Sequence, residues 1–168
     1  MYKALHRIGQ TERQLAIANA DRAVSLMIRE RDKDLPCILA DYNDCDPRDE
    51  RECGHFIERE REATRYHPWN LNAESHGCNN SHVSGYRPDK GFPYGLAIDR
   101  KWGDGTALFL YRLAHPLHEK NAIPKDESWS VNELNTLKDA ARRGARVYEA
   151  IYAELRPWHF PFIRRDAA

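Results

Sequence analysis

All four cysteines of this 168-residue chain lie between residues 37 and 78. The first 14 residues, MYKALHRIGQTERQ, contain no apolar segment or cleavage signal of a secretory leader, and no stretch approaches 18 consecutive apolar residues. We therefore expect a cytoplasmic protein without membrane association, in which the cysteines are thiols or metal ligands rather than a disulfide framework. Their crowding is the first indication of a site, and its members are Cys37, Cys45, Cys53 and Cys78.

The length of the chain suits a single domain, residues 1–168, with a core of its own. The 26 Lys and Arg residues balance 26 Asp and Glu residues, so the net charge predicts no bulk attraction to nucleic acid. Any site for a polyanion must come from local clustering of basic side chains.

A helix is expected over residues 11–33, where Thr11 and Gln14 have the spacing of a capping box. Small and apolar residues recur on one face: Ala16, Ala20, Ala23, Val24 and Met27. The opposite face is interpreted as solvated, with phosphate contacts by its arginines as the alternative. That face carries Asp21, Arg22, Ser25 and Arg29.

The rest of the chain divides into a loop-rich segment with short strands and a C-terminal helical part. Two short, largely buried helices are expected on either side of Gly-Asp-Gly at 103–105, the first with Pro93 at its first position. Ser130 and Glu133 begin the longest expected helix, which ends before Pro157. We therefore separate an N-terminal helix (1–34), a central core (35–90) and a C-terminal helical part (91–168). The last expected helix has a basic stretch, solvated or in contact with phosphate: Lys138, Arg142, Arg143 and Arg146.

The segment CGHFI, residues 53–57, reads as a short strand. Side chains alternate along a strand, so Cys53 and His55 should point to the same side and Gly54 to the other. A nucleophilic cysteine with its base is disfavoured, because neighbours on one strand are normally too splayed for the directed hydrogen bond that such a pair needs.

Three motifs in one order, CGHFIERE, ATRYHPWNLN and CNNSHVSGY, resemble the phage NinG or Rap recombination proteins. The resemblance extends from about Leu35 to Leu155 and implies an HNH-like ββα-metal endonuclease that cleaves branched DNA such as Holliday junctions. It implies an α+β fold, in which a small ββα-metal core with a short β-hairpin is embedded in N- and C-terminal helices. Branched DNA is then the expected partner, together with recombination proteins and a second copy of the chain for symmetric cutting.

The resemblance assigns a role to six residues. It places His55 at the general base that takes a proton from the attacking water, and Asn70 where an amide orients that base or ties down the connecting loop. Asn79 corresponds to a ligand of a catalytic Mg²⁺ or Mn²⁺, and His82 could join it as a ligand or bind a phosphate. Arg59 and Arg65 are expected to contact DNA phosphates, with ordinary surface ion pairs as the alternative.

The chain departs from the family pattern at the catalytic metal. Many HNH nucleases have an aspartate ligand immediately before the base, where this chain has Gly54. A carboxylate from the preceding residues could replace it, and spacing alone does not choose among Asp44, Asp46 and Glu52.

A second departure concerns a structural zinc. Related nucleases often have two C-x-x-C pairs, but here the pairs read CILA and SHGC and leave only Cys37 and Cys78. Either Cys45 and His76 complete the shell, or zinc has been lost; we favoured loss, with both remaining cysteines as small buried residues.

Two other functions stay open from the sequence. A noncatalytic DNA-binding module could keep the HNH scaffold without its chemistry. A zinc-stabilised interaction domain would use the cysteines and histidines only for structure.

Overall fold

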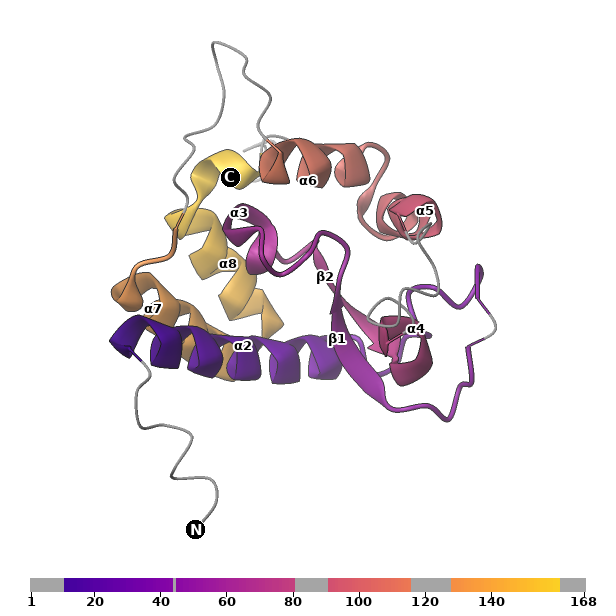
Figure 1. The fold of residues 1–168 in the computed structure, drawn as a ribbon, viewed down its shortest axis with the longest axis horizontal. Coiled ribbons are helices and arrows are strands. Elements are labelled where there is room, and N and C mark those ends of the chain that lie inside the picture. Colours follow the sequence, from indigo (N-terminus) through magenta and orange to yellow (C-terminus); the bar gives the residue numbers. More distant parts are fainter. Residues whose placement is uncertain (1–10, 44, 81–90, 116–127, 161–168) are drawn as a thin grey trace.

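The computed structural model describes residues 11–43, 45–80, 91–115 and 128–160, and its side chains from residue 93 onward in the third of these ranges (Figure 1). The described fold is α+β, with helices surrounding one two-stranded antiparallel sheet. The elements are α2 (Glu12–Arg31), β1 (Arg51–His55), α3 (Glu62–Arg65), β2 (Leu71–Ser75), α4 (His76–Asn80), α5 (Gly91–Trp102), α6 (Thr106–Ala114), α7 (Val131–Arg142), α8 (Ala145–Leu155) and the 3-10 turn η1 (Pro157–His159).

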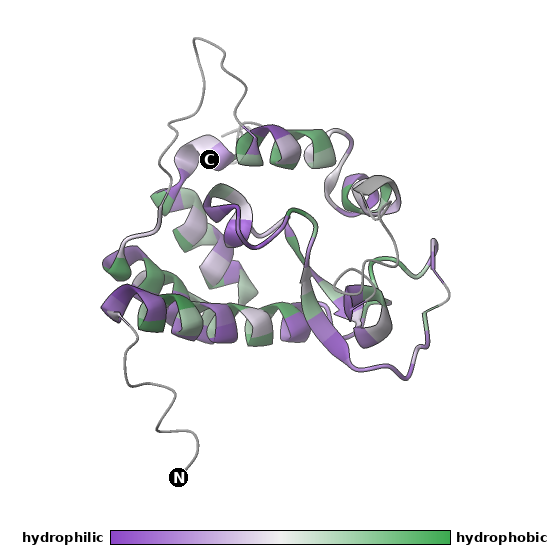
Figure 2. Cartoon of the chain, in the orientation of Figure 1, coloured by the Kyte–Doolittle hydropathy of each residue, from purple (hydrophilic) through white to green (hydrophobic). Residues whose placement is uncertain are grey.

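Helix α2 begins as the sequence predicted. The Thr11 hydroxyl accepts a hydrogen bond from the Gln14 amide at 3.2 Å, and the Gln14 side chain accepts one from the Thr11 amide at 2.8 Å, which completes the capping box. The expected apolar stripe is buried and packs along α7. Figure 2 shows polar and apolar residues alternating along α2, as expected of a helix with one face in solvent.

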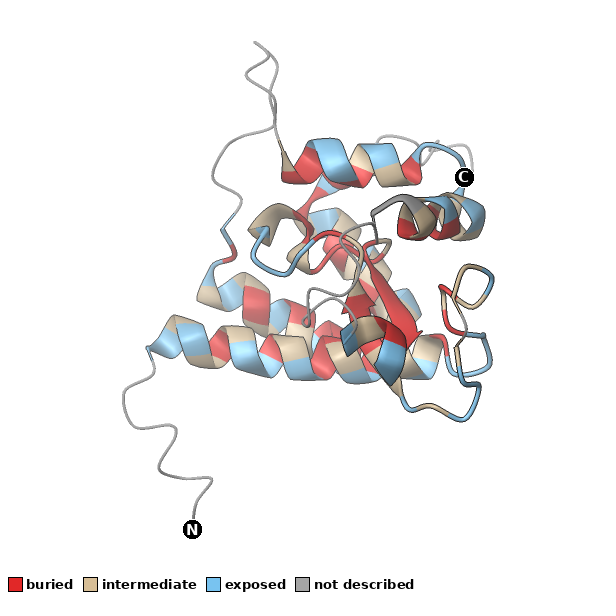
Figure 3. Cartoon of the chain, turned by 45° about the vertical axis from the view of Figure 1, so that its right-hand side comes forward, coloured by how far each residue is buried: buried red, intermediate tan, exposed pale blue. Residues whose placement is uncertain are grey.

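The sheet contains two antiparallel strands, with Arg51 opposite Ser75 and His55 opposite Leu71. Every residue of β2 is buried, whereas β1 is buried only at Cys53 and Gly54; the sheet carries much of the red in the centre of Figure 3. Their connection, residues 56–70, contains α3 and is longer than the short hairpin that we expected. Helix α4 begins directly after β2, so the elements follow in the order strand, strand, helix, with α3 between the two strands.

The prediction of one long C-terminal helix was wrong. Its capping box at Ser130 and Glu133 is present, but the helix ends at Arg142, and α8 begins only after Gly144. Gly144 has φ 106°, a left-handed conformation that interrupts a helix and strongly favours glycine. Helix α2 is consequently the longest described helix.

Helices α5 and α6 are separated at Gly103 and Gly105, as expected, but they are amphipathic rather than largely buried. Their exposed apolar residues are Leu96, Leu108 and Tyr111. Helix α5 begins at Gly91, so Pro93 is not its first residue.

Two clusters of buried residues lie against the sheet. The first joins α2, α7 and α8 to β1 and β2 through residues such as Cys53 and Leu71. The second joins the loop around Cys37 to α4, α5 and α6. Figure 1 accordingly shows α2, α7 and α8 on one side of the sheet and α4 and α5 on the other. The sheet and its flanking loops therefore connect two differently built halves.

Two histidines belong to the core rather than to a site. His67 and His159 are fully buried among aromatic rings. The Trp69 amide donates to Nδ1 of His67 at 3.2 Å, so Nε2 carries the proton and donates to the carbonyl of His159 at 3.2 Å. Burial lowers the pKa of His67 to about 3. Among the helices that the structure describes, none is long and apolar enough to span a bilayer.

Candidate functional site: the strand–strand–helix unit

Three thiols meet beside the N-terminal end of α4. The Sγ atoms of Cys37, Cys45 and Cys78 lie within 4.8 Å of one another, and those of Cys45 and Cys78 are 2.9 Å apart. Cys37 and Cys78 are the cysteines that remain of the two expected C-x-x-C pairs. Cys45 is one of the two residues that could complete a zinc shell with them. Within the described residues this is the only group of three or more His, Cys, Asp or Glu side chains close enough to hold a metal ion.

Polar groups around the cluster favour a thiolate at Cys78. Burial raises its pKa, but hydrogen bonds from Cys45, Ser75 and Asn43 outweigh this effect and lower the pKa. The pKa of Cys45 is instead raised to about 12, by burial and by its neighbouring sulfurs. The pKa of the Cys78 thiol thus lies below that of its neighbour Cys45.

The donors of this cluster suit a thiophilic cation such as zinc. A tetrahedral zinc site has Zn–S bonds of about 2.3 Å, which places its sulfurs about 3.7 Å apart, so the 2.9 Å pair would have to separate slightly. Ser75, whose hydroxyl accepts from the Cys78 amide at 3.4 Å, brings an oxygen to the same place. His76 does not take part, because its ring is exposed and lies against Glu52.

His55 lies on the other side of β1, with Cys53, as alternation predicted. Both line a cavity of about 30 Å³, enough for a water molecule, that also touches Asp21, Arg59 and Arg65. Burial and, next, the charge of Arg59 lower the pKa of His55 to about 3. The imidazole is therefore neutral at pH 7 and has a lone pair to accept a proton.

The two arginines expected to contact phosphates, Arg59 and Arg65, differ in whether their guanidinium groups are already paired. Arg65 donates to both oxygens of Asp21 at 3.1 and 2.6 Å and to the carbonyl of Arg59 at 3.1 Å, so all three guanidinium nitrogens are occupied. Arg59 is exposed, and its guanidinium contacts no described residue by hydrogen bond or ion pair. Asp21, which we placed on a solvated face, instead anchors Arg65 and accepts from the Tyr66 hydroxyl at 2.9 Å. Arg59 is therefore the residue available to a ligand.

Asn70 stabilises the loop between the strands. Its side-chain amide donates to the carbonyls of Ile57 and Thr64 at 3.1 and 3.0 Å, and its oxygen accepts from the Ile57 amide at 2.7 Å. The residue is fully buried. Of the two roles that the sequence left open, these contacts match the one that ties down the connecting loop.

Asn79 pairs with a carboxylate at the start of β1. Its side-chain amide donates to one oxygen of Glu52 at 2.6 Å, and the other oxygen lies 2.8 Å from Nδ1 of His76. The hydrogen bond from Asn79 is the main cause that lowers the pKa of Glu52. Of the two candidate carboxylates that the structure describes, Glu52 lies beside Asn79, whereas Asp46 pairs with Arg48. Asp44 and His82 lie outside the described residues.

Gly54 is the place where the sheet excludes a side chain. A Cβ at this position would overlap the carboxylate of Glu74, which is fully buried and accepts from the Tyr94 hydroxyl at 2.6 Å. A carboxylate from β2 thus occupies the space that an aspartate at position 54 would need. The sequence alone did not identify Glu74. In the antiparallel register Glu74 lies opposite Glu52, and its side chain is therefore on the same face of the sheet as Gly54.

The predicted site residues therefore form separate groups. His55 and Arg59 share the cavity beside α2, whereas Glu52 and Asn79 pair at the start of α4, with Glu52 on the Gly54 side of β1. The thiols form a third group beside α4. Compared with known proteins, the chain matches no family model, no curated protein and no solved structure.

Proposed function

We propose that this chain is a metal-dependent endonuclease that cleaves branched DNA such as Holliday junctions during phage or prophage recombination, with His55 as general base. The carrying observation is the neutral imidazole of His55 at the end of β1, in a cavity also lined by Arg59, whose guanidinium has no hydrogen-bond or ion-pair partner among the described residues. A general base must hold a free lone pair, and a phosphodiester needs a cation to position it. The order of strand, strand and helix, and the motif resemblance to NinG and Rap proteins, support the same proposal.

Substrate binding would make His55 a stronger base. A pKa of about 3 leaves the free protein with a weak base, and the charge of Arg59 is one cause of that low value. A phosphate against Arg59 brings a negative charge that offsets this effect and raises the pKa of His55. The base would then gain proton affinity only when DNA is bound.

The catalytic cation would be held by oxygen ligands. Glu52 and Asn79 bring a carboxylate and an amide together, which are ligands that Mg²⁺ or Mn²⁺ accepts. Such a cation would stabilise negative charge on the scissile phosphate and the leaving oxygen. In place of the loss of zinc favoured from the sequence, the grouping of three thiols supports a separate structural zinc, which would be held by Cys37, Cys45 and Cys78 and would link Cys37 and Cys45 to α4.

The decisive experiment compares two histidine variants. Purified protein would be incubated with a four-way junction, a flap, a linear duplex and single-stranded DNA, each with Mg²⁺, Mn²⁺ or EDTA. We expect His55→Ala to slow junction cleavage by about 10²–10⁴-fold while junction binding persists. His115→Ala is the matched control, because His115 is a partly buried histidine at the end of α6, outside the cavity of His55, whose described contacts are the carbonyl and the ring of Tyr111. Cleavage by His55→Ala at the unaltered rate would refute the proposal.

A noncatalytic DNA-binding module is the second candidate. It is favoured by the separation of His55 from the Glu52–Asn79 pair across β1. The described residues also place no group of three His, Cys, Asp or Glu ligands around that pair, where Glu52 and His76 are two. Junction binding without product under every divalent metal tested would support this module over the nuclease. Product that depends on His55 would exclude it.

A further inference from the structure

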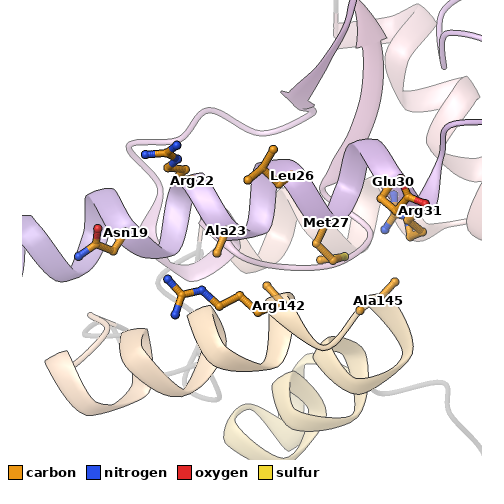
Figure 4. Close-up of a pocket in the computed structure, with 11 residues that line it drawn as sticks. Asn19, Arg22, Ala23, Leu26, Met27, Glu30, Arg31, Arg142 and Ala145 are labelled. Atoms are coloured by element: carbon orange, nitrogen blue, oxygen red, sulfur yellow. The ribbon is translucent and has the colours of Figure 1, made fainter.

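A groove lies at the junction of α2 with the turn between α7 and α8, away from the cavity of His55 (Figure 4). Its volume is about 620 Å³, within the range of ligand-binding pockets. One wall is a single face of α2, where the lining residues recur at helical spacing: Asn19, Arg22, Ala23, Leu26, Met27, Glu30 and Arg31. The other wall is Ala141, Arg142, Gly144 and Ala145.

Small residues create the groove. Ala23 on α2 faces a wall that contains two alanines and the glycine of the α7–α8 turn, so no large side chain fills the space between the helices. Leu26 remains 51% exposed at its edge. The floor is therefore apolar, and it offers leucine as a contact for an apolar side chain from outside.

The charged side chains at the rim of the groove that have no close ion-pair partner among the described residues are positive. Glu30 is paired with Lys33 at 2.7 Å, and Arg31 with Asp32 at 2.8 Å. Arg22 makes no hydrogen bond or ion pair with a described residue. Arg142 has an exposed side chain and only a long contact with Asp139 at 3.4 Å. A ligand would thus meet two available guanidinium groups beside an apolar floor.

We propose that this groove binds an acidic, amphipathic helical segment of a partner protein. A groove between two helices accepts the apolar face of a third, with side chains at i, i+3 or i+4, and i+7 as its anchors. Acidic residues flanking those anchors would pair with Arg22 and Arg142. DNA fits the groove less well, because a phosphate backbone gains nothing from the apolar floor formed by Ala23, Leu26 and the α7–α8 turn.

The test uses two labelled peptides of about 18 residues, long enough to form a helix. Both carry leucine at i, i+3 or i+4, and i+7; one has glutamate at the flanking positions and the other lysine. Fluorescence anisotropy with the full chain should show the acidic peptide bound at least about tenfold more tightly. Equal binding of both peptides, or tighter binding of the lysine peptide, would overturn the proposal.

Two pairs of variants locate the binding site. Leu26→Glu should weaken binding of the acidic peptide about tenfold or more, whereas Leu108→Glu should change it less than about twofold, since both leucines are half-exposed, at 51% and 53%. Arg142→Glu should behave like Leu26→Glu, with Arg112→Glu, an exposed arginine on α6, as its control. Thermal unfolding would verify that each variant is folded. Equal losses for a variant and its control, or displacement of the peptide by duplex DNA, would overturn the proposal.

Discussion

The half of the molecule built on α2, α7 and α8 and the half built around the cysteines are stabilised in different ways. In the first half, long helices with two capping boxes bury a continuous set of apolar and aromatic side chains. In the second, the described residues 32–43 and 45–50 contain no helix or strand, and the thiol cluster joins them to α4. Stability should be spread over many contacts in the first half. In the second, α5 and α6 also pack through apolar side chains, but the attachment of the turns to α4 should depend on a few sulfur atoms.

Replacing one cluster thiol should have the largest effect. We expect the protein, purified without added zinc, to contain one tightly bound zinc ion per chain, and Cys78→Ser to lose it. Loss of the ion should cost at least about 3 kcal/mol of unfolding free energy, because it would hold residues 37–45 against α4. Metal analysis and urea unfolding measure both quantities.

Cys53→Ser is the matched control for that substitution. Cys53 is also buried, but it belongs to the helical half and its sulfur is not in the cluster. It should keep the metal and lose about 1–2 kcal/mol, the cost of burying a hydroxyl. A metal-free wild-type protein, or equal losses in the two variants, would contradict the proposed difference between the halves.

Gly54→Asp introduces the residue that many HNH nucleases have immediately before the base, and it should destabilise the sheet. Its side chain would overlap the buried carboxylate of Glu74 and place a second negative charge beside it, at a cost of about 3 kcal/mol or more. Gly77→Ala is the control, since a Cβ there only approaches Asp49 at 3.4 Å. Chemical denaturation compares the two. A Gly54→Asp protein as stable as Gly77→Ala would refute this account of the sheet.

Sequence patterns predict contacts within one helix better than contacts between distant segments of the chain. The capping boxes at Thr11 and Ser130, and the buried stripe of α2, were confirmed because each depends on residues within one helix. The break at Gly144 was missed although its signal, a glycine within a helical pattern, is also local.

Contacts between distant segments were harder to predict. Asp21 meets Arg65 across 44 positions, and Glu74 fills the space above Gly54 only because of the strand register. The proximity of Cys45 to Cys78 likewise depends on how residues 37–45 turn. The sequence indicated that the four cysteines belong to a site. The fold brings three of them together and places Cys53 in the half built on α2, α7 and α8.

Acid should destabilise the helical half through His67. Its pKa is about 3 in the folded protein and close to 6.5 in an unfolded chain, so the unfolded state takes up the proton first as the pH falls. The stability that the neutral ring contributes is present above pH 6.5 and is lost progressively between about pH 6.5 and 3. Between pH 7 and 5 the expected loss from His67 alone is about 2 kcal/mol.

Unfolding by urea at both pH values measures this loss. His67→Phe keeps the aromatic contacts and removes the titrating group, so its stability should fall less between pH 7 and 5 than that of the wild type. His115→Phe, at a partly buried histidine that stacks only on Tyr111 among the described rings, is the control and should keep the wild-type dependence on pH. An identical pH dependence in His67→Phe and the wild type would show that the proton is taken up elsewhere.

The smallest expected effects separate the two arginines beside His55. Arg59→Ala removes a side chain with no described partner, so unfolding free energy should change by less than about 0.5 kcal/mol. If Arg59 contacts a phosphate, junction affinity should fall several-fold, and the slope of log affinity against log salt should decrease by about one.

Arg65→Ala should have the opposite pair of effects. It removes the guanidinium that pairs with Asp21 and should lower the unfolding free energy by about 1 kcal/mol or more, while the salt dependence of junction binding stays unchanged. Salt titrations of junction binding beside urea unfolding distinguish the two roles, and a changed salt slope in Arg65→Ala would mean that its pair with Asp21 opens when DNA binds.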